Sequence, residues 1–188
     1  MEDRVYAIEL AGYCNELTAW RILRDISASL LEQAGAVSPA LIMVRDDGFE
    51  LERVEGAVDI GGFEAPEVKG DAHNEASAVW SLAASVFYLV MGCQIMNGKG
   101  GKGQHATSKV PYMRSEFAKM SELVQQCLQY RPELRPSAKK VNKIATEQYK
   151  ICAEIVSRGP KFRKKTGATD EKTSINNELA FWPEPMRQ

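Results

Sequence analysis

Residues 76–91 read ASAVWSLAASVFYLVM and are the most apolar run of the chain. At the 3.6-residue period of an α-helix their large side chains leave no continuous polar face, which is typical of a helix buried on all sides. A membrane span is the alternative interpretation. However, a bilayer requires roughly twenty apolar residues, and this run is shorter and contains three serines. We therefore expect the central helix of a globular core and no membrane span.

The composition is typical of one globular domain with a tail. The chain has 188 residues, of which 44% are hydrophobic, and this is enough to bury a substantial core. Its net charge of -1 gives no electrostatic argument for binding to nucleic acid or to an anionic membrane.

The cysteines and the N-terminus bear on the compartment. Cys14, Cys93, Cys127 and Cys152 are too far apart in sequence to indicate a metal or redox motif, so we expect free thiols in a reducing compartment. The first ten residues carry acids and lack the apolar core of a signal peptide. The sequence therefore predicts a cytoplasmic protein that needs no metal or other cofactor.

Hydrophobic spacing predicts an amphipathic helix over residues 17–34, with Trp20 on its buried face. We expect this helix to end at Gly35, because glycine can adopt the left-handed conformation beyond a helix end. A short helix around Ile8 and Leu10 is expected before it, closing one end of the core.

The pattern then changes to that of a small β-hairpin. Residues 41–44 form a short apolar run, residues 46–48 read Asp-Asp-Gly and signal a turn, and a second strand follows. Phe49, Leu51 and Val54 are the candidates for its packed side. Because two strands alone are only marginally stable in water, the hairpin should lie against the helices.

Residues 97–109 are rich in glycine, lysine and small polar residues, which indicates an exposed loop. A phosphate-binding loop is the alternative interpretation, because Lys99 and Lys102 lie among glycines. That motif requires a preceding strand and a Ser or Thr after the lysine. Here a helix precedes the loop, and Gly103 follows Lys102.

Two further helices complete the predicted domain. The first covers residues 115–130, and the second begins after Ser137, its expected N-cap, and runs to about Arg158. The apolar face of the second comprises Val141, Ile144, Ala145, Ile151, Ile155 and Val156. The predicted fold class is therefore mainly α, with a buried central helix and one small β-hairpin.

The composition changes again near Pro160. We expect a domain over residues 1–159 and a flexible, basic tail over residues 160–188. The end of the tail combines Phe181, Trp182 and Pro183, a combination that is typical of a docking segment. It could dock on its own domain or on a partner, and an idle tail is a third alternative.

Three motifs, in the right order, resemble the C-terminal lobe of a protein kinase. Residues 65–67 resemble the family's Ala-Pro-Glu motif, and residues 78–83 resemble its Asp-Val-Trp-Ser-Leu-Gly signature. Residues 127–138 resemble the segment that carries its buried arginine. The resemblance implies a structural ion pair between Glu67 and Arg135, and a bidentate guanidinium is the partner that a buried carboxylate needs.

The catalytic parts of the kinase pattern are missing. Only sixteen residues precede the first amphipathic helix, so we expect no N-terminal lobe in this chain. Residues 35–37 lead directly into residues 38–42, without a His-Arg-Asp motif. The metal-binding Asp-Phe-Gly should follow Leu51, but residues 53–55 read Arg-Val-Glu, and Ala78 replaces the aspartate that tethers the catalytic loop.

This combination resembles the kinase non-catalytic C-lobe domain, or KIND module, of Spir-type actin nucleators and some large scaffold phosphatases. Such modules resemble this chain in their early short helix, in a helix bearing a tryptophan such as Trp20, and in a Ser-Pro pair such as Ser38-Pro39. In that family the module binds segments of partner proteins. The resemblance therefore implies an interaction domain whose partner is another protein or peptide.

The residue types support the same conclusion. Trp80 and Leu82 lie on the apolar run and are expected in the core, whereas His73 and His105 are expected on the surface. We therefore expect no enzyme, but a non-catalytic interaction module or scaffold, and leave a homodimer open. The alternative is a regulator that binds a kinase or a separate N-terminal lobe through the loop with Lys99 and Lys102.

Overall fold

The computed structural model describes residues 4–54, 60–68, 73–95 and 113–158. The chain divides into two units, Met1–Cys152 and Ala153–Gln188, and of the second unit only the end of the last helix is described. The described elements, with η for a 3-10 helix, are η1 (Ala7–Leu10), α1 (Glu16–Glu32), β1 (Ile42–Arg45), β2 (Gly48–Leu51), η2 (Gly61–Phe63), α2 (Glu75–Met91), η3 (Ser115–Phe117), α3 (Ala118–Cys127), η4 (Pro132–Leu134) and α4 (Ala138–Ser157). The prediction of a mainly helical domain with one small hairpin is confirmed.

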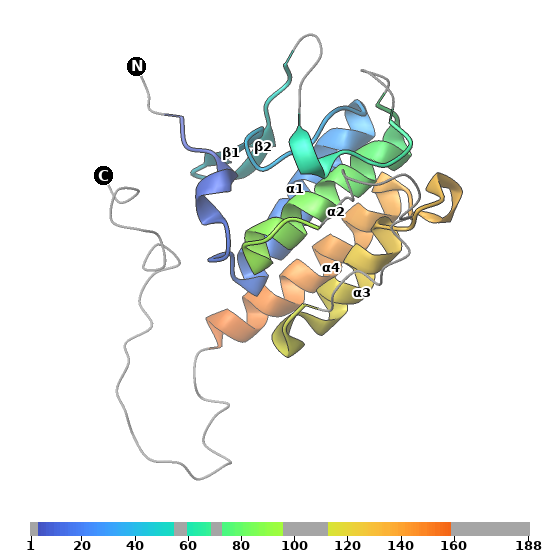
Figure 1. Cartoon of the computed structure of the whole chain (residues 1–188). Coiled ribbons are helices and arrows are strands. Elements are labelled where there is room, and N and C mark those ends of the chain that lie inside the picture. The colour runs from blue at the N-terminus through green and yellow to red at the C-terminus, as the bar shows by residue number, and fades with distance from the viewer. Residues whose placement is uncertain (1–3, 55–59, 69–72, 96–112, 159–188) are drawn as a thin grey trace. The chain divides into compact units, whose positions relative to one another are not determined.

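The apolar run forms α2, and α1 and α3 both pack against it (Figure 1). Thirteen of its 17 residues are buried. Ser81 and Ser85 are among them, and each hydroxyl donates to the carbonyl four residues earlier, at 3.0 and 2.7 Å. Such bonds satisfy buried hydroxyls within the helix itself. The helix can therefore be buried all round although it contains serines.

Both ends of α2 are closed by local contacts. At the N-terminus, the side chain of Asn74 accepts from the Ser77 N–H, and the Ser77 hydroxyl accepts from the Asn74 N–H, both at 2.9 Å. This reciprocal capping box satisfies two backbone donors that a helix start leaves unpaired. At the C-terminus, Gly92 adopts the left-handed conformation, with φ of 72°.

The end of α1 differs from the prediction. The helix ends at Glu32, and Gln33 beyond it is extended, so Gly35 does not terminate it. Instead Arg53, which follows the hairpin, donates from its guanidinium to the carbonyls of Ser29 and Gln33 at 2.8 and 2.7 Å. A cation at the C-terminal end of a helix also interacts favourably with the helix dipole. The C-cap is therefore supplied by a distant side chain.

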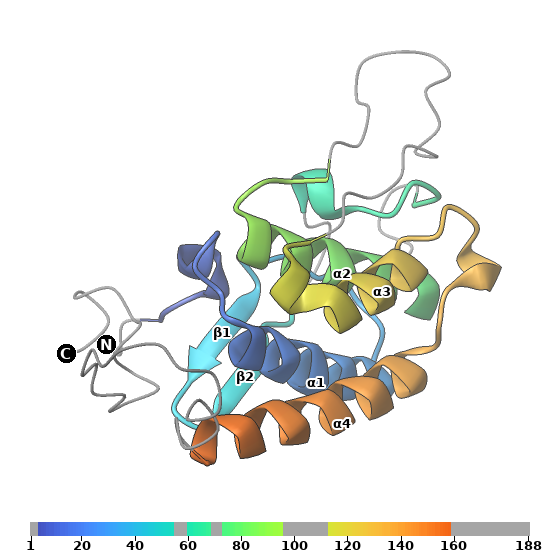
Figure 2. The same cartoon turned by 90° about the horizontal axis from the view of Figure 1, so that it is seen from below.

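The hairpin is antiparallel and packs against α1 (Figure 2). Gly48 opens β2 rather than lying in the turn. A side chain is excluded at this position, because a Cβ would stand 2.6 Å from the Asp25 carboxylate on α1. That carboxylate accepts from the Phe49 N–H at 3.2 Å. Leu51 is buried and Phe49 is half-buried, but Val54 is exposed, so its assignment to the packed side was wrong. The strand ends at Leu51, and the alternation of side chains ends with it.

The N-terminal segment forms backbone hydrogen bonds with β1 and with the last turn of α2. Val5 accepts from the Val44 N–H at 2.9 Å and Tyr6 bridges to Met43, so the segment pairs with the outer edge of β1. Farther along, Gly12 donates to the Leu89 carbonyl of α2 at 2.7 Å. The short helix expected in this segment is the 3-10 helix η1.

The last two helices are joined by the turn that contains η4. The helix expected over residues 115–130 is a 3-10 turn, η3, followed by α3, which ends at Cys127. The Ser137 hydroxyl accepts from the Lys140 N–H at 3.3 Å, as expected of a cap for α4. Of the predicted apolar face of α4, only Val141 and Ala145 are buried, together with Ala138. Ile151, Ile155 and Val156 are exposed, so the expected core face holds only for the first half of the helix.

Candidate functional site

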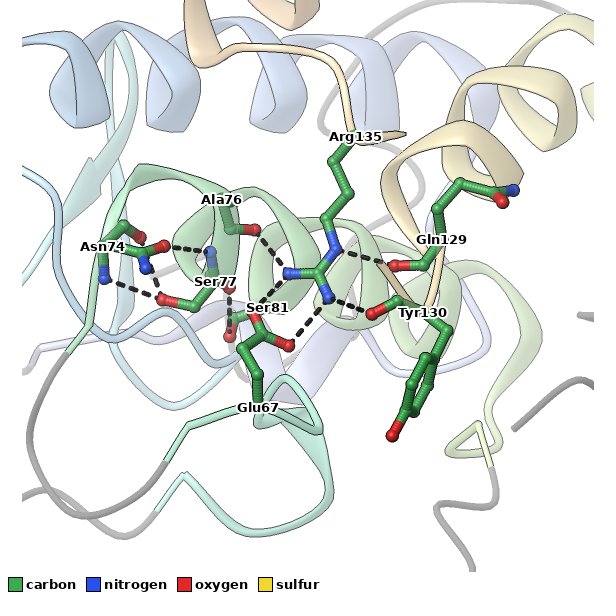
Figure 3. A network of polar contacts seen from close by, with 8 residues as sticks. All are labelled: Glu67, Asn74, Ala76, Ser77, Ser81, Gln129, Tyr130 and Arg135. Atoms are coloured by element: carbon green, nitrogen blue, oxygen red, sulfur yellow. Dashed lines mark hydrogen bonds and ion pairs between the residues drawn. The ribbon is translucent and has the colours of Figure 1, made fainter. Parts of the chain in front are cut away.

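The polar centre of the fold is Arg135, whose side chain is fully buried directly after η4 (Figure 3). Its Nε donates to the Gln129 carbonyl at 2.8 Å. Nη1 donates to Glu67 and to the Ala76 carbonyl at 2.5 and 3.0 Å, and Nη2 donates to Glu67 and to the Tyr130 carbonyl at 2.8 and 3.1 Å. A guanidinium has five N–H groups, and here every one of them has a partner.

Glu67 supplies the opposite charge from the segment before α2. Its side chain is 28% exposed, whereas that of Arg135 is fully buried. Partial burial, the largest single influence, raises the pKa of the Glu67 carboxyl. The hydrogen bonds from Arg135, a backbone hydrogen bond and the positive charge of Arg135 together outweigh burial and hold this pKa below its ordinary value. Glu67 is therefore ionised at neutral pH and balances the buried cation.

Trp80 completes this cluster from α2. The Arg135 guanidinium lies over the indole ring, 4.8 Å from its centroid, and Trp80 is buried. Leu82 is buried on the same helix, and Trp20 is buried on α1, where its indole N–H donates to Glu16 at 3.2 Å. The structure thus brings Glu67, Arg135 and Trp80 together and places the other two residues elsewhere in the core.

A further contact joins the starts of α2 and α4. The Glu75 carboxylate, in the first turn of α2, accepts from the Ala138 N–H at 2.7 Å. Together with the bonds of Arg135, this contact connects α2, the end of α3 and the start of α4 (Figure 3). The arrangement is that of a structural junction, because all five N–H groups of Arg135 and the Glu75 carboxylate are used in contacts between these elements.

The segment that would hold a kinase catalytic loop is a tight, buried turn. The Leu41 N–H donates to the Ser38 carbonyl at 2.9 Å, which closes the turn immediately before β1. Ser38 and Leu41 are buried, and the Pro39 carbonyl accepts from the Ile8 N–H at 3.0 Å. The turn is therefore fixed by backbone hydrogen bonds within itself and to the N-terminal segment.

Two further positions, Arg53 and Ala78, carry other residue types than the kinase motifs that they resemble. Arg53 lies just beyond β2, in the segment that the sequence resemblance aligns with the kinase metal-binding motif, and its guanidinium is bonded to the end of α1. Ala78, on α2, is fully buried and carries only a methyl group, so it cannot tether a loop. The first of these positions thus holds a cation, and the second holds a small apolar side chain.

The described part of the chain offers little other chemistry. It contains no group of three or more His, Cys, Asp or Glu side chains that could hold a metal ion. Burial raises the pKa of the Cys14 and Cys127 thiols to about 12, which makes them poor nucleophiles at neutral pH. Among the described helices, none combines the length and the apolar character needed to cross a bilayer.

Several predicted contact residues lie outside the described ranges. These are Lys99 and Lys102 in the glycine-rich loop and Phe181, Trp182 and Pro183 in the tail. The alternative of a kinase regulator was based on the first pair. It therefore stays a sequence-based hypothesis.

Sequence reasoning missed two features. Arg53 was interpreted only as the loss of a metal ligand, because its acceptors lie 20 and 24 residues away and no periodicity signals a distant cap. The exposed apolar side chains of Tyr130 and Leu134 were also missed. The two prolines around η4 were a signal for a rigid turn, but they did not show which side chains the turn would expose.

The comparisons with known proteins concern the fold. No protein-family model matches the sequence, and no curated protein matches it. Among solved structures, the chain is similar to the PknI kinase domain of M. tuberculosis, with a TM-score of 0.58 and 17% sequence identity. The match covers 78% of this chain and 62% of that domain, so the chain spans about three fifths of the kinase domain that it matches.

This similarity shows a protein-kinase-like fold. The mainly helical structure with a two-stranded hairpin is consistent with the C-terminal lobe of that fold. At this identity the similarity bears on the fold alone.

Proposed function

We propose that this chain is a catalytically inactive, kinase-lobe-like module that binds other proteins, as an interaction domain or scaffold. The observation that carries the proposal is the structural role of the Arg53 side chain. Its guanidinium donates to Gln33 and Ser29 and so holds the end of α1, at the position where phosphoryl transfer would require a metal-binding carboxylate.

The physical argument concerns charge. Phosphoryl transfer depends on metal ions that neutralise the charge of the phosphates and position them. A guanidinium at the metal position repels Mg²⁺, and the closed turn from Ser38 to Leu41 contains no group that could act as a base. Both features support a role without catalysis.

The rigid framework of the helical domain supports a role in binding other proteins. Five bonds from Arg135 and the capping box of α2 hold a rigid helical framework. A rigid framework lowers the entropic cost of presenting a binding surface. The resemblance to the KIND module, whose members bind protein segments, points in the same direction.

The proposal is tested on the full chain in two measurements. Thermal unfolding is first followed with and without ATP and Mg²⁺; we expect no shift, because only a ligand of the native state stabilises it. A magnesium-dependent rise in Tm of more than about 2 °C would contradict the proposal.

The second measurement seeks the partner. Tagged full chain is used to capture proteins, and each candidate is then purified and recombined with the untagged chain. We expect at least one candidate to co-elute with it at fixed stoichiometry in size-exclusion chromatography. If no candidate forms such a complex, the role as an interaction module is wrong.

A further inference from the structure

One continuous stretch of chain exposes both apolar and basic side chains. We define the 130–143 surface as η4, its flanking residues and the first turns of α4, which follow one another along the chain (Figure 1). Tyr130 and Leu134 are 47% and 59% exposed. The exposed basic side chains are those of Arg131, Lys139, Lys140 and Lys143.

The turn that carries Tyr130 and Leu134 is held rigidly by hydrogen bonds. Arg135 donates to the carbonyls of Gln129 and Tyr130, and the Leu134 N–H donates to the Arg131 carbonyl at 3.1 Å. Pro132 lies at the start of η4, where its fixed φ suits the turn. Because the backbone is already ordered, a partner does not need to order it on binding.

The ion pairs of these basic side chains can be judged over residues 4–54, 60–68, 73–95 and 113–158. In the described part of the chain, none of the four forms an ion pair. Glu133 is the one acid between residues 130 and 143. Lys139 and Lys140 also lie at the start of α4, where positive charge is unfavourable to the helix dipole and the Glu75 carboxylate partly offsets it. A negatively charged ligand would therefore be stabilised along this stretch.

We propose that the 130–143 surface binds an acidic segment of a partner protein that also carries a large apolar side chain. This inference rests on the proposed function and names the surface and the chemistry of the partner. The lysines complement acidic side chains, and Leu134 and Tyr130 offer apolar contact area of the kind found at interface hot spots. A nucleic acid would satisfy the lysines but would leave Leu134 without an apolar partner.

The test is a selection from a random peptide library displayed on phage, with the full chain as bait. We expect the enriched peptides to be rich in Asp and Glu and to share an aliphatic or aromatic residue. Their synthetic versions should bind the full chain in fluorescence anisotropy. Affinity should fall with added salt, because the contacts are at the surface.

Charge-reversed variants locate the site. The double variant Lys139→Glu, Lys143→Glu should weaken binding at least about tenfold, because it places like charges opposite the peptide. The matched control is Lys119→Glu, Lys150→Glu, which changes the net charge equally on exposed positions outside the surface. It should change affinity by less than about twofold.

A second pair of variants tests the apolar contact. Leu134→Ser should weaken binding several-fold, whereas Leu31→Ser, on an equally exposed leucine of α1, should not. Circular dichroism and Tm confirm that each variant is folded.

Three results would overturn this inference: enriched peptides without acidic residues, equal losses in the control variants, or no enrichment at all. A single-stranded oligonucleotide or phosphatidylserine vesicles that bind where the peptides do not would also overturn it. The proposed function would stand in each case if the co-elution experiment yields a complex, since that complex would then use another surface.

Discussion

At the scale of single residues, Arg135 shows how a buried charge can belong to the framework of a protein. All five of its N–H groups are bonded, and three of their acceptors are backbone carbonyls just beyond the end of α3 and at the start of α2. Lysine could not replace it, because an ammonium has three donors and no planar fork. The need for five donors in one plane explains why the position holds arginine.

The first prediction concerns the partner of this arginine. Glu67→Ala should lower the free energy of unfolding by about 3 kcal/mol, because it leaves the fully buried guanidinium of Arg135 without a counter-charge. Urea unfolding measures the change. The control Glu32→Ala, at an exposed position, should change it by less than about 0.5 kcal/mol. Equal effects of the two variants would show that the pair does not stabilise the fold.

The second prediction concerns pH. The pKa of Glu67 is lower in the folded protein than its ordinary value of 4.5. Its contribution to stability is therefore complete above pH 4.5 and is lost as the pH falls through the lower, folded pKa. The free-energy difference between the wild type and Glu67→Gln, from urea unfolding at a series of pH values, should be constant near neutral pH and shrink below pH 4.5. A difference that is independent of pH would contradict the ion pair.

At the scale of elements, some helix ends are capped by neighbouring residues and others by side chains from distant segments. The start of α2 is capped by its own Asn74 and Ser77, whereas the end of α1 depends on Arg53 from beyond the hairpin. The hairpin depends in turn on Asp25 of α1, which accepts from the Phe49 N–H. Helix α1 and the hairpin therefore stabilise each other.

The third prediction tests this dependence. Arg53→Ala should destabilise the last turn of α1 by about 1 kcal/mol, because two carbonyls lose a charged donor. Amide hydrogen exchange should show faster exchange at the end of α1 and at β2. The control Arg45→Ala removes an exposed arginine of the same hairpin and should leave exchange in α1 unchanged. Unchanged exchange in Arg53→Ala would show that the cap contributes nothing.

At the scale of the whole molecule, the chain has a protein-kinase-like fold, and its N-terminal segment makes structural contacts with the hairpin. The N-terminal segment covers the edge of β1, and this contact removes an open strand edge that could pair with other chains. The same N-terminal segment also contacts the turn from Ser38 to Leu41, because the Ile8 N–H donates to the Pro39 carbonyl. The N-terminal segment is thereby held both at the strand edge and at the turn before it.

The fourth prediction uses the cysteines as probes of this closed framework. Cys93 is exposed, whereas Cys14 and Cys127 are buried with pKa values of about 12. A thiol reagent such as DTNB should modify Cys93 within minutes and the two buried thiols only after addition of urea, because the thiolate is the reactive form. The variant Cys93→Ser should lose the fast phase. Rapid modification of Cys14 would show that the core opens readily.

Several features followed from the sequence because their causes are local. The apolar run at residues 76–91 has no polar face, and this property alone placed α2 at the centre. The Asp-Asp-Gly signal located the hairpin, and Ser137 located the start of α4. The resemblance to kinase motifs indicated that Glu67 and Arg135 would form an ion pair. The distance between the two residues in the sequence could not have indicated this by itself.

Only the tertiary structure decided the remaining features, because their partners are far apart in the chain. Arg135 and Glu67 are 68 residues apart, and Arg53 reaches across 24 residues to α1. The apolar side chains of Ile151, Ile155 and Val156 continue the hydrophobic period of α4 but are exposed, whereas Val141 and Ala145 are buried. Sequence by itself determined which segments are helical and which helix is central. Packing decided which amphipathic faces are covered, because burial depends on the neighbours that the fold supplies.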